Sequence, residues 1–386
     1  MARRDPGGIM TNGVLVPVET VEVLAYTVPT DGPGGKEADG TLEWESTTCV
    51  VILVSADGHT GLGYTYGEAA TAALIDGKLA QLVLGADALA PAATWRAMSE
   101  QLRNAGRPGV GMMAISAVDI ALWDLRARLS GRALCRELPS FHDAVPIYGS
   151  GGFCNYPISR LLEQLEGWVA EGIPRVKLKT SRYPAEDPAR LAAVRWAIGD
   201  EPQLFADANG ALSRKEALFW ASAFREEYGI SWFEEPVSSD DVTGLAMVRA
   251  AAPPGLEVAA GEYGYVLTDF ARWLGADAVD CLQADVTRCG GITGLLQVAG
   301  LAAAHQIDLS AHCAPALSAH ALCAVERMRH LEYFHDHNRV EHLLFDGVLV
   351  PKDGELRPRP DDPGLGLELR RSDGEKYQVF GAEHHR

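Results

Sequence analysis

The 386-residue sequence has little positive charge: 34 Lys and Arg residues stand against 52 Asp and Glu residues, a formal net charge of −18. Because nucleic acids and anionic membranes select basic surfaces, this deficit argues against both as partners. No run of 18 apolar residues occurs, and the first residues lack the apolar core of a signal peptide, so neither membrane insertion nor secretion is expected. The seven cysteines are odd in number and include no Cys-x-x-Cys pair, which favours reduced thiols in a cytoplasmic protein.

The chain is long enough for two domains. Hydrophobic residues make up 47% of it, and a barrel of about 200–250 residues would leave more than a hundred for a second domain. We expect residues 1–12 to form a flexible tail and residues 13–140 a small α+β domain. We place the barrel at residues 141–335 and expect residues 336–386 to return to the first domain.

A hairpin and a helix define the first domain. Residues 49–54 form a β-branched run, Asp57-Gly58 is a strong turn signal, and residues 61–66 begin the return strand. Apolar residues at helical spacing predict a helix over 115–129. Residues 31–40, rich in Gly and Asp, are expected to form a long flexible loop.

Ionisable residues recur in the second domain, each at the end of a short apolar run. They are Lys179, Asp207, Glu234, Glu262, Asp285 and His312, at successive steps of 28, 27, 28, 23 and 27 residues. A strand, a helix and two loops occupy about this much chain, so the spacing predicts repeated β/α units. In a (β/α) barrel the carboxyl ends of the strands meet at one face, where the active site lies. The six side chains are therefore expected to share one pocket of an enzyme.

Two further strands would complete the barrel, ending near Gly149 and Glu332. After Glu332 no helix of comparable length is predicted. The proline-containing tail is expected to run back over the first domain.

Three carboxylates, those of Asp207, Glu234 and Glu262, end successive predicted strands. Crowded together, they would raise one another's pKa unless a cation neutralised them. Oxygen-only ligands on a rigid frame suit a hard divalent ion such as Mg²⁺. The alternative is that each carboxylate pairs with a neighbouring Lys or Arg at the barrel rim.

Two groups of residues are candidate bases. Lys177 and Lys179 lie on the same side of a strand, where mutual repulsion would lower the pKa of Lys179 toward that of a usable base. The alternative is a solvated pair at the edge of the sheet. Asp285 and His312 fall on adjacent strands, so the carboxylate is expected to orient the imidazole and raise its basicity. A single His at a strand end can also be purely structural.

The sequence resembles the enolase superfamily, in particular its mandelate racemase subgroup. The motifs that carry the resemblance are Lys177-Leu178-Lys179, Asp207-Ala208-Asn209, Glu234-Glu235-Pro236, Gly261-Glu262, Asp285, Gly-Gly-Ile-Thr at 290–293, Ser-Ala-His at 310–312 and Leu331-Glu332. The resemblance implies an α/β fold, a modified (β/α)₇β TIM barrel with an N-terminal α+β capping domain. It also implies Mg²⁺ on Asp207, Glu234 and Glu262, with Lys179 as the base on one face of the substrate and the His312–Asp285 pair on the other. Asn209, Lys177 and Glu332 would contact the substrate.

The reaction implied by this resemblance begins with removal of the proton next to a carboxylate. Mg²⁺, and Glu332 as a hydrogen-bond donor if protonated, would stabilise the resulting ene-diolate. Our leading hypothesis is a dehydratase that converts an acid sugar to a 2-keto-3-deoxy acid. The alternatives are a racemase or epimerase of a 2-hydroxy acid, a sugar-acid cycloisomerase, and a non-catalytic sugar-acid binding protein. Members of this family commonly form oligomers, so the resemblance implies that this protein is a homo-oligomer.

Substrate specificity is expected to lie in segments 31–46 and 66–73. Trp44, Tyr64 and Tyr66 are candidates for substrate contact, although aromatic packing is an equal alternative. Arg288 follows Asp285 and would tune the site or pair with that residue.

His335-Asp336-His337 has the residue types of a metal motif. We expect it in a loop after the last strand, without an evident third ligand.

Overall fold

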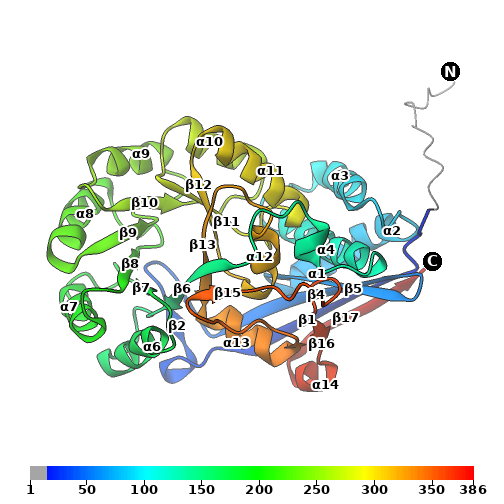
Figure 1. Cartoon of the computed structure of the whole chain (residues 1–386), viewed down its shortest axis with the longest axis horizontal. Helices are drawn as coiled ribbons and strands as arrows, with labels where there is room; N and C mark the ends of the chain where they lie inside the picture. Colours follow the sequence, from blue (N-terminus) through cyan, green and yellow to red (C-terminus); the bar gives the residue numbers. More distant parts are fainter. Residues whose placement is uncertain (1–14) are drawn as a thin grey trace.

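The computed structural model describes residues 15–386, so the tail expected at residues 1–12 lies outside the described residues. Figure 1 shows a ring of alternating strands and helices beside a strand-rich layer with its own helices. Within the described residues, no helix combines the length and apolar character needed to cross a membrane.

Eight parallel strands form the closed barrel of the larger part. They are β6 (Val145–Gly151), β7 (Arg175–Lys179), β8 (Gln203–Asp207), β9 (Ile230–Glu234), β10 (Glu257–Ala260), β11 (Cys281–Ala284), β12 (Asp308–Ala311) and β13 (Met328–Phe334). Each strand pairs with the next along the chain, and β13 pairs with β6 to close the ring. The predicted barrel is confirmed.

Seven helices connect these strands. They lie on the outside of the ring (Figure 1). They are α6 (Ile158–Ala170), α7 (Asp187–Ile198), α8 (Arg214–Tyr228), α9 (Val242–Ala251), α10 (Leu267–Gly275), α11 (Gly291–Ala304) and α12 (Pro315–Leu322). Helix α8 illustrates local sequence control, because Ser213 and Glu216 form a reciprocal capping box at its start. It ends at Gly229, whose φ of 63° is left-handed.

An aromatic layer fills the barrel interior beneath the strand ends. Tyr148, Phe205 and Trp232 are buried there, and the rings of Phe205 and Trp232 stack with centroids 5.5 Å apart. Because strand side chains alternate, Trp232 and Glu234 point to the same side of β9. The indole Nε1 of Trp232 donates to Glu234 Oε2 at 2.9 Å, so the packed layer orients a carboxylate of the site.

The smaller part is built on a four-stranded antiparallel sheet in the order β17-β1-β4-β5. Its strands are β1 (Thr20–Pro29), β4 (Ser46–Ala56), β5 (His59–Tyr66) and β17 (Gln378–His385). The predicted hairpin is confirmed, with Asp57 and Gly58 at φ of 46° and 72° in the turn between β4 and β5. In Figure 1 the red β17 lies beside the blue β1, so the end of the chain joins this sheet.

Helices cover one face of this sheet. They are α1 (Ala69–Leu74), a π-helical turn (Ile75–Leu79), α2 (Ala80–Val83), α3 (Pro91–Gln101), a 3₁₀ turn (Leu102–Asn104) and α4 (Val110–Leu129). The short α5 (Leu134–Glu137) follows α4 and contacts α12 of the barrel. The helix predicted over 115–129 is confirmed as part of α4. Gly61 and Gly63 let α4 approach β5 closely, because a Cβ at either position would lie 2.2 Å from a backbone oxygen of α4.

The flexible loop predicted at 31–40 is wrong. A 3₁₀ turn (Pro33–Gly35) leads into β2 (Glu37–Ala38), which pairs with β3 (Glu43–Trp44). Ala38 N donates to Asn155 Oδ1 at 3.1 Å, and Asn155 Nδ2 donates to Lys36 O at 2.9 Å. These contacts fix the hairpin on the loop that follows β6.

The region after Glu332 also differs from the prediction. A ten-residue helix, α13 (His335–Leu344), follows β13 directly and contains the His335-Asp336-His337 motif at its start. It contacts β4 of the smaller domain and therefore lies between the two domains (Figure 1). The remaining elements are β14 (Phe345–Asp346), β15 (Glu355–Leu356), β16 (Glu368–Leu369), α14 (Arg371–Gly374) and a 3₁₀ turn (Glu375–Tyr377).

Polar contacts from α4 hold the start of α11. Ser116 Oγ accepts hydrogen bonds from Gly290 N and Gly291 N at 2.9 and 3.0 Å. Asp119 accepts from Thr293 N at 2.9 Å and from Thr293 Oγ1 at 2.6 Å. Because the first backbone N–H groups of a helix have no partner within it, the smaller domain supplies the missing acceptors.

Replacing Asp119 with Ala should therefore weaken the attachment of the two domains. The change leaves buried donors of Thr293 without an acceptor, which costs about 1–3 kcal/mol of the free energy of unfolding. Urea denaturation of the variant and wild type measures this difference. The exposed Asp200 is the control position, where Ala should leave the midpoint unchanged; equal midpoints for both variants would contradict the role of Asp119.

Candidate active site

The three candidate metal ligands converge at the carboxyl ends of β8, β9 and β10. Asp207 and Glu234 are the last residues of their strands, and Glu262 lies two residues beyond β10. All three are buried, and one carboxylate oxygen from each lies within 4.8 Å of the others. The buried Oε2 of Glu262 lies 3.1 Å from His312 Nε2. A buried, three-carboxylate, oxygen-only set fits a hard divalent cation such as Mg²⁺.

The electrostatics of Glu234 point the same way. Burial raises its pKa to about 8; Lys177 opposes this effect, and the carboxylates of Asp207, Glu332 and Glu262 reinforce it. A bound divalent ion would favour the ionised form of this carboxylate.

Lys177 lies beneath the cluster and is fully buried. Its Nζ lies 2.5 Å from Glu234 Oε1, 2.8 Å from Glu332 Oε1 and 3.3 Å from Asp207 Oδ2. Burial opposes its charge, but these carboxylates outweigh burial and raise its pKa well above the ordinary value. Lys177 is therefore a fixed positive charge that binds carboxylate oxygens.

Lys179 points toward the same side, as the alternation of strand side chains predicted. Its Nζ donates to Asp207 Oδ2 at 2.6 Å, and 5% of the residue is exposed. We expected a net lowering of the pKa of Lys179, and this expectation is wrong for the protein without a bound ion. Burial and Lys177 do lower it, but Asp207 is so close that the pKa lies above the ordinary value.

Asp285 and His312 form the predicted pair on adjacent strands. His312 Nδ1 lies 2.7 Å from Asp285 Oδ2, and Asp285 Oδ1 accepts from both N and Oγ1 of Thr287 at 2.7 Å. This leaves His312 Nε2 directed at the cluster, 3.1 Å from Glu262 Oε2. Burial would lower the pKa of His312, but the acidic groups around it, including Glu262, raise it well above the ordinary value.

Glu332 lies within β13 and faces the same pocket. Its Oε1 accepts from Ser150 Oγ at 2.6 Å and lies 2.8 Å from Lys177 Nζ. Burial favours the neutral carboxyl, but Lys177 and His312 outweigh burial and lower the pKa of Glu332 below its usual range. Among the protein's own groups Glu332 is therefore an ionised acceptor, and a donor role for its protonated form stays a prediction.

Asn209 occupies a left-handed conformation with φ of 45° just after β8. Its backbone N donates to Asp207 Oδ1 at 2.8 Å, and its buried side-chain Oδ1 has no hydrogen-bond partner in the part of the chain that the structure describes. The side chain lines the cavity, so this amide oxygen is available to a ligand.

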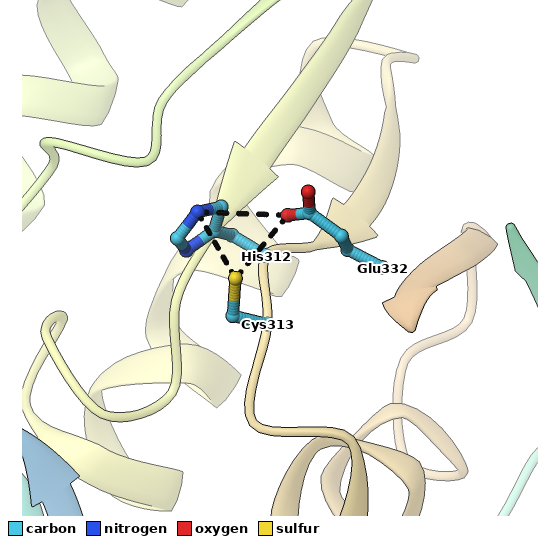
Figure 2. Close-up of side chains that lie close together, drawn as sticks. All are labelled: His312, Cys313 and Glu332. Carbon is cyan, nitrogen blue, oxygen red and sulfur yellow. Dashed lines mark hydrogen bonds and ion pairs between the residues drawn. The ribbon is translucent and has the colours of Figure 1, made fainter. Parts of the chain in front are cut away.

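Sequence reasoning missed Cys313 and Ser150. Figure 2 shows the Cys313 thiol beside His312 and Glu332; Sγ lies 3.2 Å from His312 Nε2 and 3.4 Å from Glu332 Oε2. Cys313 has a left-handed φ of 52°. No residue pattern in the sequence predicts this backbone turn. Ser150 lies in β6, one residue beyond the strand end expected near Gly149.

A cavity of about 380 Å³ opens above these residues, and both specificity segments contribute to it. Trp44 lines it from segment 31–46, and Tyr66 from segment 66–73. Arg288 also lines the cavity and donates to Glu262 O at 3.2 Å. Tyr64 does not line it: its hydroxyl donates to Glu341 at 2.5 Å within the core, so the packing alternative holds for Tyr64.

Glu341 gives a pH dependence that is separate from the catalytic cluster. Burial raises its pKa to about 8, despite hydrogen bonds from Tyr64 Oη and Ala316 N. The folded protein therefore keeps this proton at pH values where the unfolded chain has lost it, and stability falls as pH rises from about 5 to 8. One such proton contributes at most about 1.4 kcal/mol per pH unit.

In Glu341→Gln, the free energy of unfolding should fall less steeply between pH 5 and 8 than in the wild type. Urea denaturation at intervals of half a pH unit measures the slope. Because Gln cannot accept from both donors, the variant should also lose a pH-independent amount of stability. Parallel curves for the two proteins would contradict a raised pKa at Glu341.

Two family descriptions match the chain. Residues 28–138 match the mandelate racemase/muconate lactonizing enzyme N-terminal domain, and residues 160–373 match the enolase C-terminal domain-like family. The chain belongs to the mandelate racemase/muconate lactonizing enzyme family.

Individual relatives agree with this assignment. The 3,6-anhydro-alpha-L-galactonate cycloisomerase of Streptomyces coelicolor is 34% identical over 362 residues, which cover 91% of this chain and 97% of that protein. A mandelate racemase/muconate lactonizing enzyme-like protein from Rubrobacter xylanophilus is 59% identical, with a TM-score of 0.92 over 94% of this chain and 100% of that one. L-talarate/galactarate dehydratase from Salmonella typhimurium LT2, solved with Mg and L-lyxarohydroxamate, is 27% identical with a TM-score of 0.88, covering 100% of both chains.

The predicted family and fold are confirmed, and the protein is an enzyme of the lyase or isomerase class. The magnesium prediction agrees with a family member solved with that ion. The alternative of a non-catalytic binding protein has no support among these relatives.

Proposed function

We propose that this family member removes the proton next to a substrate carboxylate and then eliminates water, as an acid-sugar dehydratase. One observation carries the proposal: the two candidate bases contact different carboxylates of the cluster. Lys179 Nζ contacts Asp207 at 2.6 Å, and His312 Nε2 lies 3.1 Å from Glu262. Glu234, on the strand between, separates them. A substrate carboxylate at the cluster would present opposite faces of its α-carbon to Lys179 and His312.

Asp207, Glu234 and Glu262 are the proposed ligands of a magnesium ion. A bound Mg²⁺ would supply positive charge that stabilises the enolised carboxylate and that offsets the effect of Asp207 on the pKa of Lys179. Lys177 binds carboxylate oxygens from below, and Asn209 Oδ1 accepts from a substrate hydroxyl.

The protein's own groups carry the proton transfers. Lys179 Nζ, after losing its own ammonium proton to solvent, accepts the α-proton on its face of the substrate. His312, oriented by Asp285, gives the proton from Nε2 to the departing β-hydroxyl on the other face, and water leaves. The resulting enol becomes the 2-keto-3-deoxy acid on taking up a solvent proton at carbon 3.

Cycloisomerisation is the second candidate, because a 34% identical relative is a cycloisomerase. The same bases would serve, with a ring oxygen or lactone as the group that leaves or is attacked. Racemisation, which needs only reprotonation from the opposite face, remains the third alternative. Assembly into a homo-oligomer and a cytoplasmic location remain predictions.

Charge on the capping side of the cavity favours substrates with a single carboxylate. Within the part of the chain that the structure describes, this side contributes hydroxyl groups such as those of Thr47 and Thr48 and the carboxylates of Asp39 and Glu68, but no Lys or Arg. A second substrate carboxylate there would meet acids without a compensating cation. We therefore propose a polyhydroxy monocarboxylic acid as the substrate.

A panel of sugar acids in the presence of Mg²⁺ tests these proposals. Each monoacid is paired with the diacid of the same stereochemistry, and products are followed by NMR and mass spectrometry. Loss of water from a monoacid with at least about tenfold higher kcat/KM than its paired diacid, about 1.4 kcal/mol, is the expected result. Faster turnover of the diacid would reject the monoacid proposal, and isomerisation without loss of water would reject the dehydratase.

A further inference from the structure

We propose that the enzyme has a second divalent-cation site, formed by Asp31, Glu37, His335 and Asp336. It is distinct from the proposed magnesium site and does not depend on the proposed reaction. The first two residues flank the 3₁₀ turn that leads into β2, and the last two begin α13. The His335-Asp336-His337 motif thus gains the further ligands that the sequence alone did not reveal.

The four side chains converge tightly, although Asp31 and Glu37 lie about 300 residues before His335 and Asp336 in the sequence. Each offers one possible ligand atom, and these atoms all lie within 4.8 Å of one another. His335 Nε2 is 2.8 Å from Asp31 Oδ1. Asp31 is exposed and His335 half-buried, so an ion from solvent can reach the cluster.

Two buried carboxylate oxygens in the cluster have no hydrogen-bond partner among residues 15–386. They are Oε2 of Glu37, a residue with no exposed surface, and Oδ1 of Asp336, which is 1% exposed. Buried polar atoms without a partner are rare in native proteins and call for an explanation such as a bound ion.

The other oxygen of each carboxylate is held in place. Tyr156 Oη donates to Glu37 Oε1 at 3.1 Å. Trp44 Nε1 and Thr47 Oγ1 donate to Asp336 Oδ2 at 3.1 and 3.2 Å. These hydrogen bonds fix the orientation of both carboxylates and of their unpartnered oxygens. Hydrogen bonds around metal sites orient the ligands in the same way.

Nearby arginines neutralise this charge only in part. Arg160 lies 3.6 Å from Asp31 Oδ2, and Arg339 lies 3.8 Å from Asp336 Oδ1 while donating to Pro29 O at 2.7 Å. Glu37 has no Lys or Arg ion pair among the described residues. Burial beside Asp336 raises the pKa of Glu37 to about 10, so a proton shared by the two carboxylates is the competing explanation.

The donor set selects the kind of ion. One imidazole nitrogen with three carboxylates suits Zn²⁺ or Mn²⁺ better than Mg²⁺, which prefers oxygen ligands and retained waters. His337, the third residue of the motif, is used differently: its ring stacks on Tyr66 with centroids 3.4 Å apart.

An ion at this site would fasten the specificity segment to the barrel. Asp31 and Glu37 belong to the chain that leads into the 37–44 hairpin, whereas Asp336 follows β13 and lines the active-site cavity. Binding would thus fix a wall of the substrate cavity without contact with the reacting atoms.

Zinc binding to the full-length, magnesium-saturated protein tests the proposal. Calorimetry and metal analysis should find one zinc ion per chain in the wild type, with at least tenfold weaker binding in Glu37→Gln and His335→Ala. His342→Ala is the matched control, because His342 is an exposed histidine on the same helix and should leave binding unchanged. Absence of zinc binding to the wild type, or equal binding by all four proteins, would overturn the proposal in favour of a shared proton.

The X-ray absorption spectrum of zinc in the wild type decides the matter even if a variant folds poorly. An imidazole nitrogen with oxygen neighbours supports the proposed site. A sulfur neighbour would reject it, because His312, Cys313 and Glu332 also bring ligand atoms within 4.8 Å of one another and would place the ion in the active site.

Discussion

Replacing Lys179 with Met is expected to lower kcat by about 10²–10⁴-fold, the usual contribution of a positioned base. The amine that contacts Asp207 is lost, while a chain of similar length still fills the wall of the cavity. His312→Asn should cause a loss of the same order, because dehydration needs both the base and the acid. Steady-state kinetics on the substrate found in the panel measures both effects.

Lys352→Met is the control for this prediction, because Lys352 is an exposed lysine outside the active-site cavity. It should retain wild-type kcat. Undiminished kcat in both Lys179→Met and His312→Asn would reject the two-base mechanism. Retention of α-proton exchange by each single variant, from opposite enantiomers, would instead favour a racemase.

Replacing Glu234 with Gln is expected to weaken magnesium binding and to lower kcat at limiting magnesium by at least about 10²-fold, since the ion supplies several kcal/mol of charge stabilisation. The variant removes one of three carboxylates whose oxygens converge within 4.8 Å. Calorimetric titration with Mg²⁺, together with kcat at increasing magnesium concentration, separates lost binding from lost chemistry.

Glu235 is the matched control for this experiment. It is the neighbouring buried glutamate of the same Glu-Glu-Pro motif, yet it contributes no oxygen to the converging cluster. Glu235→Gln should therefore bind Mg²⁺ like the wild type. Loss of magnesium from Glu235→Gln with full retention in Glu234→Gln would exchange the roles of the two residues.

The barrel and its site were predictable because the strand ends carry a local signal. Asp207 and Glu234 end strands whose preceding residues are apolar and buried, so the charge marks both the end of the strand and the face of the barrel. Glu262 lies beyond its strand, and the same run of apolar residues still located it.

The hairpin at 37–44 was not predictable from its own residues. Its strands are two residues each, and their position depends on Asn155, which lies more than a hundred residues away. Helix α13 was missed for a similar reason. Asp336 and Glu341 occupy buried positions on it, so its sequence lacks the apolar stripe of a surface helix.

Protonation states within the site also lay beyond sequence reasoning. The Lys177–Lys179 spacing suggested mutual repulsion, but the 2.6 Å contact with Asp207 determines the pKa of Lys179. Glu332 similarly depends on the 2.8 Å approach of Lys177. Such distances arise from strand register around the closed barrel, which the order of residues does not state.

The most direct test of the account is turnover in D₂O with saturating Mg²⁺, followed by NMR. For a polyhydroxy monocarboxylic acid, we expect loss of water and one solvent deuterium at carbon 3 of the 2-keto-3-deoxy product, with neither event in Lys179→Met. Neither turnover nor α-proton exchange for any acid of the panel, from protein shown to bind magnesium, would contradict it.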